Sequence, residues 1–217
     1  MFNSDYYYHI YNRGVEKRRV FLDKSDYQRF LLSLEEFNRL EPVGSLYDLG
    51  KRNKRNSIPN KRNSIPLKES NSSNSSAPLV DVICYCLNPN HFHLLVKQKI
   101  ESGISKFIHK LSLGYTNYFN NKYSRSGALF QGKYKRKEIK TEGGLLKLSV
   151  YINCNAEIHG IDKKENWPWS SYKSFLKGNP LTRNRIPLRE SDSFSFLCEQ
   201  LLPEIKQIKN LEKYGLE

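Results

Sequence analysis

Residues 80–98 constrain the fold more than any other part of the chain, because they have the pattern of a β-hairpin. The runs VDVICYCL (80–87) and HFHLLVKQ (91–98) are rich in β-branched, aromatic and other apolar residues, as strands are. Between them, Asn88-Pro89-Asn90 is turn chemistry, with the proline where its fixed φ suits the second turn position. We therefore predict two antiparallel strands joined by a tight turn.

Two further segments have the apolar spacing of amphipathic helices. They run from about Ser25 to Leu40, where Asp23 or Ser25 suits the N-cap, and over residues 102–122. The expected buried stripes are Tyr27, Phe30, Leu31, Leu34 and Phe37 in the first segment and Ile104, Phe107, Ile108, Leu111, Tyr115, Tyr118 and Phe119 in the second.

The remaining elements are expected before the first of these helices and after the second. Residues 6–12 predict an opening strand, which Asn12-Arg13-Gly14 would end as a turn, and residues 128–140 predict a basic strand pair or ribbon. Thr141 suits the cap of a helix that runs to about Ile158, with Gly160 as its stop. An amphipathic helix is expected near residues 192–213.

The chain has 217 residues, which suffices for one domain with a hydrophobic core and falls short of two full-size domains. Residues 45–78 differ in composition, with a tandem repeat KRNSIPN (54–60) and KRNSIPL (61–67). So polar a stretch cannot bury enough apolar surface to offset the conformational entropy that it would lose on becoming ordered. We therefore expect a catalytic domain over residues 1–180, interrupted by a disordered polar insertion at 45–78, and a C-terminal tail over 181–217 that contains the amphipathic helix.

The charge balance suggests a polyanionic partner. Lysine and arginine number 36 against 22 acidic residues, a formal net charge of +14, and cations that neutralise phosphates gain affinity from counterion release. A solvated basic surface without a partner is the alternative. The four cysteines form no CxxC pair, and no secretory signal or run of about 20 apolar residues is present. We expect a cytoplasmic, nucleoid-associated protein with no membrane contact.

His91 and His93 lie two apart on the second hairpin strand, so strand alternation puts both on one face. Two imidazoles that converge in this way can hold a divalent metal ion. Phe92, Leu94 and Val96 would then face the core. The alternative is a pair of polar residues on the wet face of a sheet.

Tyr151 and Asn155 are four apart on a predicted helix and therefore share a face. The Asn155 amide could complete the shell of a Mg²⁺ or Mn²⁺ ion, which prefers oxygen. The Tyr151 hydroxyl could act as a nucleophile. The alternative is a core aromatic and a surface amide near a helix end. Tyr115, Tyr118 and Tyr123 are rival nucleophiles, although the first two lie on an apolar stripe.

Five segments together resemble a known family. NPNHFHLLV (88–96) resembles the histidine–hydrophobe–histidine strand of the HUH endonucleases, especially the REP-associated tyrosine transposases and related single-domain insertion-sequence transposases. YINCN (151–155) is similar to the family's Tyr-Ile-x-x-Asn helix motif. The other segments, in family order, are YHIYNRG (8–14), SGALFQGKYKRKEI (126–139) and WPWSSY (167–172).

The resemblance implies an α+β, ferredoxin-like domain with a central antiparallel sheet flanked by helices. It implies that His91 and His93 bind a divalent ion, Mg²⁺ or Mn²⁺, with Asn155 as auxiliary ligand. Tyr151 would cleave single-stranded or hairpin DNA through a 5′-phosphotyrosine, in a monomer or a homodimer. Ala156 departs from the proline that the family often has, and a longer helix is expected there.

Arg13, Lys133, Lys135, Arg136 and Lys137 are candidate phosphate contacts, each with a solvated charge as the alternative. His9 on the opening strand could approach the metal site. Two other functions stay open: a domesticated single-strand nucleic-acid-binding module that no longer transposes, and a metal-dependent phosphodiesterase that hydrolyses without a covalent intermediate. Covalent trapping of DNA on the protein separates both from the transposase.

Overall fold

The fold is built on a four-stranded antiparallel sheet. The computed structural model describes residues 2–41, 77–177 and 193–214. The strands are β1 (Tyr7–Arg13), β2 (Val80–Asn88), β3 (His91–Gln98) and β4 (Lys135–Ile139), in the sheet order β2-β3-β1-β4. All three neighbouring pairs are antiparallel. The predicted insertion at 45–78 lies outside the described residues up to residue 76.

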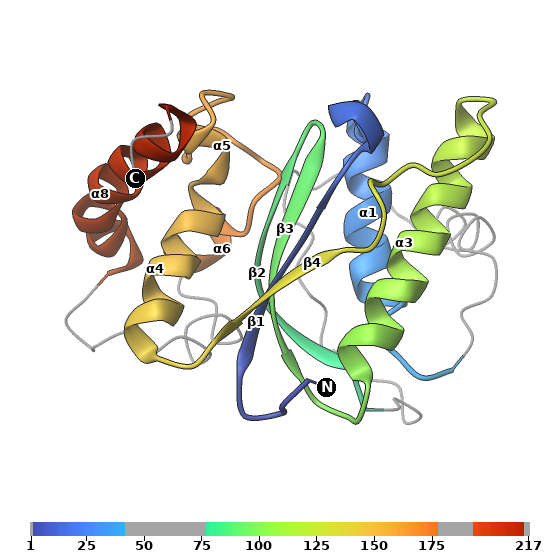
Figure 1. The fold of residues 1–217 in the computed structure, drawn as a ribbon, viewed down its shortest axis with the longest axis horizontal. Coiled ribbons are helices and arrows are strands. Elements are labelled where there is room, and N and C mark those ends of the chain that lie inside the picture. Colours follow the sequence, from blue (N-terminus) through green and yellow to red (C-terminus); the bar gives the residue numbers. More distant parts are fainter. Residues whose placement is uncertain (1, 42–76, 178–192, 215–217) are drawn as a thin grey trace, which may run out of the picture.

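Two helices connect the strands and cover one face of the sheet. Helix α1 (Lys24–Glu36) leads from β1 to β2, and α3 (Gly103–Lys122) leads from β3 to β4. In Figure 1 both lie on the same side of the sheet. This connectivity and strand order are those of the split βαβ, ferredoxin-like arrangement, so the predicted α+β fold class is confirmed.

The core beneath α1 and α3 follows the predicted patterns. Phe92, Leu94 and Val96 of β3 are fully buried there, as strand alternation requires. The stripe of α3 is also buried, except for Tyr118, which packs at its margin. The other face of β3 is therefore the one that carries His91 and His93.

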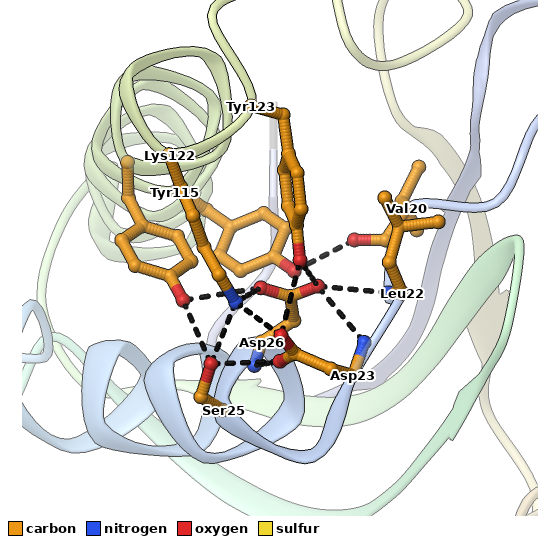
Figure 2. A network of polar contacts seen from close by, with 9 residues as sticks. Val20, Leu22, Asp23, Ser25, Asp26, Tyr115, Lys122 and Tyr123 are labelled. Atoms are coloured by element: carbon orange, nitrogen blue, oxygen red, sulfur yellow. Dashed lines mark hydrogen bonds and ion pairs between the residues drawn. The ribbon is translucent and has the colours of Figure 1, made fainter.

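Helix α1 begins with a capping box and ends at Glu36, earlier than expected. Asp23 is the N-cap: its side chain accepts from the backbone N–H of Asp26, and the Asp26 side chain accepts from that of Asp23. The fully buried Asp26 carboxylate also accepts from the Lys122 ammonium of α3 and from the phenol of Tyr123, the residue after α3 (Figure 2). The phenol of Tyr118 in α3 donates to it as well. Two of the three rival tyrosines are therefore engaged in tying α1 to α3.

Residues 128–140 do not form the predicted strand pair. Only β4 (Lys135–Ile139) is a strand, and it pairs with β1. Gly127 and Gly132 have positive φ, which interrupts an extended run. Leu129 and Phe130 are buried instead, with Phe130 bridging to Gly14.

A second helical layer covers the opposite face of the sheet. It contains α4 (Glu142–Asn153), α5 (Asn155–Ile158), α6 (Tyr172–Leu176) and α8 (Phe194–Tyr214). Thr141 caps α4, and its side chain accepts from the Gly144 N–H. The predicted single helix to Ile158 is wrong in one respect, because Cys154 leaves helical geometry and divides it. Ala156 therefore does not lengthen the helix; it is buried in the core of this layer.

The motif WPWSSY lies along β2 and fastens it to α4. The Trp167 indole N–H donates to the Leu87 carbonyl over 3.1 Å. The Ser171 hydroxyl donates to the Asn153 side-chain oxygen over 2.7 Å. The end of β2, where Asn88 precedes the turn, is thereby held in place against α4.

Helix α8 packs against α4 in Figure 1. Its docked face buries Phe194, Cys198 and Leu202 in the core of this layer. Ion pairs join Lys147 of α4 to Glu204 and Lys206 of α8 to Glu157 of α5. Within the described residues, no helix combines the length and apolar character needed to cross a membrane.

Candidate active site

The candidate site is a cavity of about 830 Å³ at the end of the sheet where the β2–β3 turn meets α4 and α5. Its lining brings together side chains from β1, β3 and α4. The described lining residues include no acidic side chain. They comprise the rings of Tyr11, His91, His93, Tyr151 and His159, the cations Arg13, Lys17, Arg19 and Lys135, the amides Asn12, Asn90 and Gln131, and Pro89 and Ile161.

His93 is held from the β1 side of the sheet. It lies opposite Tyr11 in the β1–β3 register, and its Nδ1 is 2.8 Å from the Nε2 of His9. Both imidazoles are nearly inaccessible to solvent. Burial lowers the pKa of His93 well below its ordinary value and that of His9 to about 4, with the Lys137 charge adding to the effect on His9. Both rings are therefore neutral near pH 7.

His91 uses its two ring nitrogens differently. Its Nδ1 is 2.6 Å from the Asn90 side-chain oxygen, which can only accept, so the Nδ1 carries the proton. Its Nε2 accepts from the Asn88 amide nitrogen at 2.9 Å and lies 3.4 Å from the Asn155 side-chain oxygen. Burial, with a smaller contribution from neighbouring His159, lowers the pKa of His91 to about 4. The His91 Nε2 thus presents a lone pair.

Asn155 is the first residue of α5 and is fully buried. Its side-chain oxygen is 2.5 Å from the Asn88 amide nitrogen. Its own amide nitrogen is buried without a hydrogen-bond partner. The alternative interpretation of Asn155 as a surface amide is therefore wrong: the side chain is buried, with its oxygen turned toward His91.

Tyr151 reaches the histidines of its own chain. The ring centroids of Tyr151 and His93 are 5.6 Å apart at 82°, an edge-to-face contact, and Tyr151 approaches His9 in the same way at 6.1 Å. From α8, the Lys209 ammonium lies over the Tyr151 ring, 5.6 Å from its centroid. The break at Cys154 does not separate Tyr151 from Asn155, because both still face the same end of β3.

Only two of the five predicted phosphate contacts line the cavity. Arg13 and Lys135 are the two that line it, and Lys135 extends from β4. The Arg13 Nε is 2.5 Å from the Gln131 side-chain oxygen. Lys137 is opposite His9 in the register. Arg136 points to the other face of the sheet, where its guanidinium covers the Phe2 ring. Lys133 is exposed before β4 begins.

Sequence reasoning gave no role in the site to His159 or Asn88. His159 makes an edge-to-face contact with His91 and continues the row of Tyr151 and Asn155 at a spacing of four, the signal that could have found it. Asn88 pairs directly with His91 across the two-residue turn. Cross-strand neighbours of a predicted metal ligand are therefore worth testing as partners.

The donor set fits a divalent ion without a carboxylate. Among the described residues, no three His, Cys, Asp or Glu side chains are grouped so as to hold a metal ion. The available donors are instead the His91 and His93 imidazoles and the Asn155 amide oxygen, in which the His91 Nε2 and Asn155 Oδ1 both face the Asn88 amide group. Imidazole and amide oxygen are both established metal ligands.

Comparisons with known proteins bear on the family and the fold of this chain. A family model described as "Transposase IS200 like" matches residues 51–155, a range that includes the two histidines, Tyr151 and Asn155. A solved structure of a REP-associated tyrosine transposase bound to a REP hairpin is 12% identical, with 83% of each chain covered and a TM-score of 0.53. At that identity the likeness concerns the fold alone. The comparison with curated proteins gave no match.

Proposed function

We propose that this chain cleaves and rejoins single-stranded DNA with Tyr151 as nucleophile. The starting point is that the chain belongs to the family of IS200-like transposases. The observation that carries this proposal is the edge-to-face contact of Tyr151 with His93, inside a cavity lined by cations and by no described acidic residue. A nucleophile for a phosphodiester needs such surroundings, because the substrate is an anion.

His91, His93 and Asn155 would hold a divalent ion, Mg²⁺ or Mn²⁺. Such an ion would draw charge from the phosphate oxygens as the nucleophile attacks. The neutral imidazoles support this assignment, since their lone pairs are available to a cation. His9 and Asn90 would hold the Nδ1 atoms of His93 and His91 and so direct the Nε2 atoms toward the ion.

The proposed reaction keeps the number of phosphoester bonds constant. The Tyr151 oxygen bonds to phosphorus while the bond from phosphorus to the 3′-oxygen breaks. The phenol loses its proton and the departing 3′-oxygen gains one, which leaves a 5′-phosphotyrosine and a free 3′-hydroxyl. Attack by the 3′-hydroxyl of a second strand reverses these changes and restores the phenol. No nucleotide cofactor is needed, because each step exchanges one phosphoester for another.

The DNA strand would enter along the cationic side of the cavity. Arg13, Lys17 and Arg19 follow one another at the end of β1, and Lys135 faces them from β4. The solved structure that resembles this chain is bound to a REP hairpin, so a hairpin with a single-stranded flank is the substrate to try. Because Tyr151 lies at the histidines of its own chain, cleavage within one chain is favoured over exchange between two.

Covalent trapping tests the proposal. The protein is mixed with labelled hairpin oligonucleotides and Mn²⁺ or Mg²⁺, denatured, and examined for a labelled protein band. We expect a metal-dependent adduct that Tyr151→Phe abolishes while DNA binding persists. Tyr118→Phe is the matched control, since it removes a phenol that bonds Asp26 on the other side of the sheet, and it should leave the adduct intact.

Three outcomes would contradict the proposal. An adduct that persists in Tyr151→Phe would exclude this nucleophile. Cleaved DNA without any adduct would indicate hydrolysis by water. Binding without cleavage across a hairpin library would indicate a domesticated binding module.

A further inference from the structure

Three polar atoms from three elements form a closed triangle beside the cavity of the candidate site, which one of the three residues, His91, lines. The Asn88 Nδ2 is 2.9 Å from the His91 Nε2 and 2.5 Å from the Asn155 Oδ1, and the last two atoms are 3.4 Å apart. Two corners of this triangle are the groups proposed above as metal ligands. The third corner, Asn88, has no role in that proposal.

The size of the triangle matches an ion's ligand shell. Neighbouring ligands of an octahedral Mg²⁺ with bonds of 2.0–2.1 Å are about 3 Å apart. The His91 Nε2 and Asn155 Oδ1 both offer lone pairs, and the Asn88 amide group now donates its hydrogens to both. The third corner is thus occupied by a positively polarised N–H₂ group, where an ion would require a third acceptor.

The Asn88 side chain can present its oxygen to the same place. Half a turn about its Cβ–Cγ bond exchanges the amide nitrogen and oxygen and requires no movement of the backbone. The Asn88 Oδ1 now has a long contact of 3.5 Å with the Cys86 thiol. Sulfur is a weak acceptor as well as a weak donor, so the turned amide keeps a partner there.

Asn88 is held firmly enough for this role. It is fully buried, ends β2, and pairs with His91 across the turn. Asn155 keeps its oxygen toward the triangle although its own amide nitrogen is then buried without a partner. Turning Asn155 over would set its donor against the donor of Asn88, so the two amides fix each other's orientation.

We propose that Asn88 is a further ligand of the divalent ion, which in the ion-free protein closes the site with its amide hydrogens and in the bound protein turns its oxygen to the ion. This inference rests on the proposed function, since it assumes an ion at His91, His93 and Asn155. It adds the last residue of β2 to that set and couples ion binding to a change in one side-chain torsion.

Ion affinity without DNA tests the role of Asn88. Mn²⁺ binding is measured by titration calorimetry and by electron paramagnetic resonance in a Tyr151→Phe background, where no cleavage interferes. Asn88→Leu keeps the approximate size and removes the oxygen, and we expect it to weaken Mn²⁺ binding about tenfold to a hundredfold. Asn88→Asp adds a charged oxygen at the same place and should tighten both Mn²⁺ and Mg²⁺ binding.

Gln98→Leu is the matched control. Gln98 is a buried amide at the far end of the same hairpin, opposite Val80, and its loss should leave Mn²⁺ affinity unchanged. Circular dichroism verifies that each variant is folded, and Asn88→Asp carries the test if Asn88→Leu is not.

The results separate this inference from the one on which it depends. Wild-type-like or tighter Mn²⁺ binding by Asn88→Leu, or no gain in Asn88→Asp, would overturn the role of Asn88 while leaving the ion site. Absence of Mn²⁺ binding in the parent protein, or binding that survives His91→Ala, would overturn the ion site and Asn88 with it.

Discussion

The Nε2 of His9 on β1 lies 2.8 Å from the Nδ1 of His93 on β3, inside the sheet face that carries the candidate site. The rings are roughly parallel, with centroids 5.0 Å apart. A hydrogen bond at Nδ1 fixes both the orientation of the His93 ring and the nitrogen that carries its proton. Because His9 bonds to His93 and is not among the residues that line the cavity, we expect it to position His93.

Replacing His9 by phenylalanine should impair ion binding and cleavage together. Phe keeps a ring of similar size in the sheet and removes the hydrogen bond, so His93 loses its orienting partner. We expect Mn²⁺ affinity to fall about tenfold or more, with partial recovery in His9→Gln, whose amide can still bond to His93. Single-turnover cleavage and Mn²⁺ titration measure the effect. His109→Phe, at an exposed position of α3, is the control; equal losses in both variants would refute a positioning role.

Adjacent residues of β4 should differ in their effect on DNA binding. Lys135 lines the cavity, whereas Arg136 points to the opposite face and covers Phe2. We expect Lys135→Gln to weaken single-strand binding and to lower the slope of log K against log salt by about 1, as for one lost phosphate contact. Arg136→Gln removes the same charge one residue away and should leave the slope unchanged. Equal slopes in the two variants would mean that the net charge of the chain, not the cavity, governs binding.

The hairpin, the two core helices and the histidine face could be predicted because each depends on local periodicity. Alternation in β3 was enough to separate Phe92 and Leu94 from His91 and His93. The strand pair expected at 128–140 was wrong because β4 finds its partner in β1, more than a hundred residues earlier in the chain. A partner so distant leaves no trace in the local sequence. The glycines that interrupt the run, in contrast, are visible there.

Features of the candidate site that depend on sequence spacing could be predicted, whereas features that depend on tertiary packing could not. Tyr151 and Asn155 are four residues apart, and despite the break at Cys154 Tyr151 contacts His93 while Asn155 lies near His91. The orientation of the Asn155 amide depends on Asn88, which belongs to another element. The contact between Lys209 and Tyr151 likewise depends on how α8 docks against α4, which no local pattern specifies.

Loss of the Asp26 carboxylate should destabilise the fold without altering the site. Asp26 is fully buried and accepts from Lys122 at 2.7 Å and from Tyr118 and Tyr123 (Figure 2). In Asp26→Ala these donors lose their shared acceptor, and we expect the free energy of unfolding to fall by about 3 kcal/mol. Urea denaturation measures it. Asp23→Ala, which removes the exposed N-cap, should cost about 1 kcal/mol. Unchanged Mn²⁺ affinity in the folded variant would confirm that this network is separate from the site; an equal cost for both substitutions would contradict the role given to Asp26.

Gly14 should tolerate no side chain, because the chain doubles back closely on it. A Cβ built there would lie 2.3 Å from the Arg18 carbonyl oxygen and 2.9 Å from a Val20 methyl. Gly14→Ala must therefore displace the segment that carries Lys17 and Arg19 to the cavity. We expect a loss of about 1–3 kcal/mol in unfolding free energy, together with weaker single-strand binding. Gly143→Ala in α4 is the opposite case, since a Cβ there meets nothing within 4 Å, and helix propensity predicts a gain of about 0.5–1 kcal/mol. Urea denaturation and a binding titration on both variants test the contrast, and a Gly14→Ala protein as stable as the parent would refute the close approach.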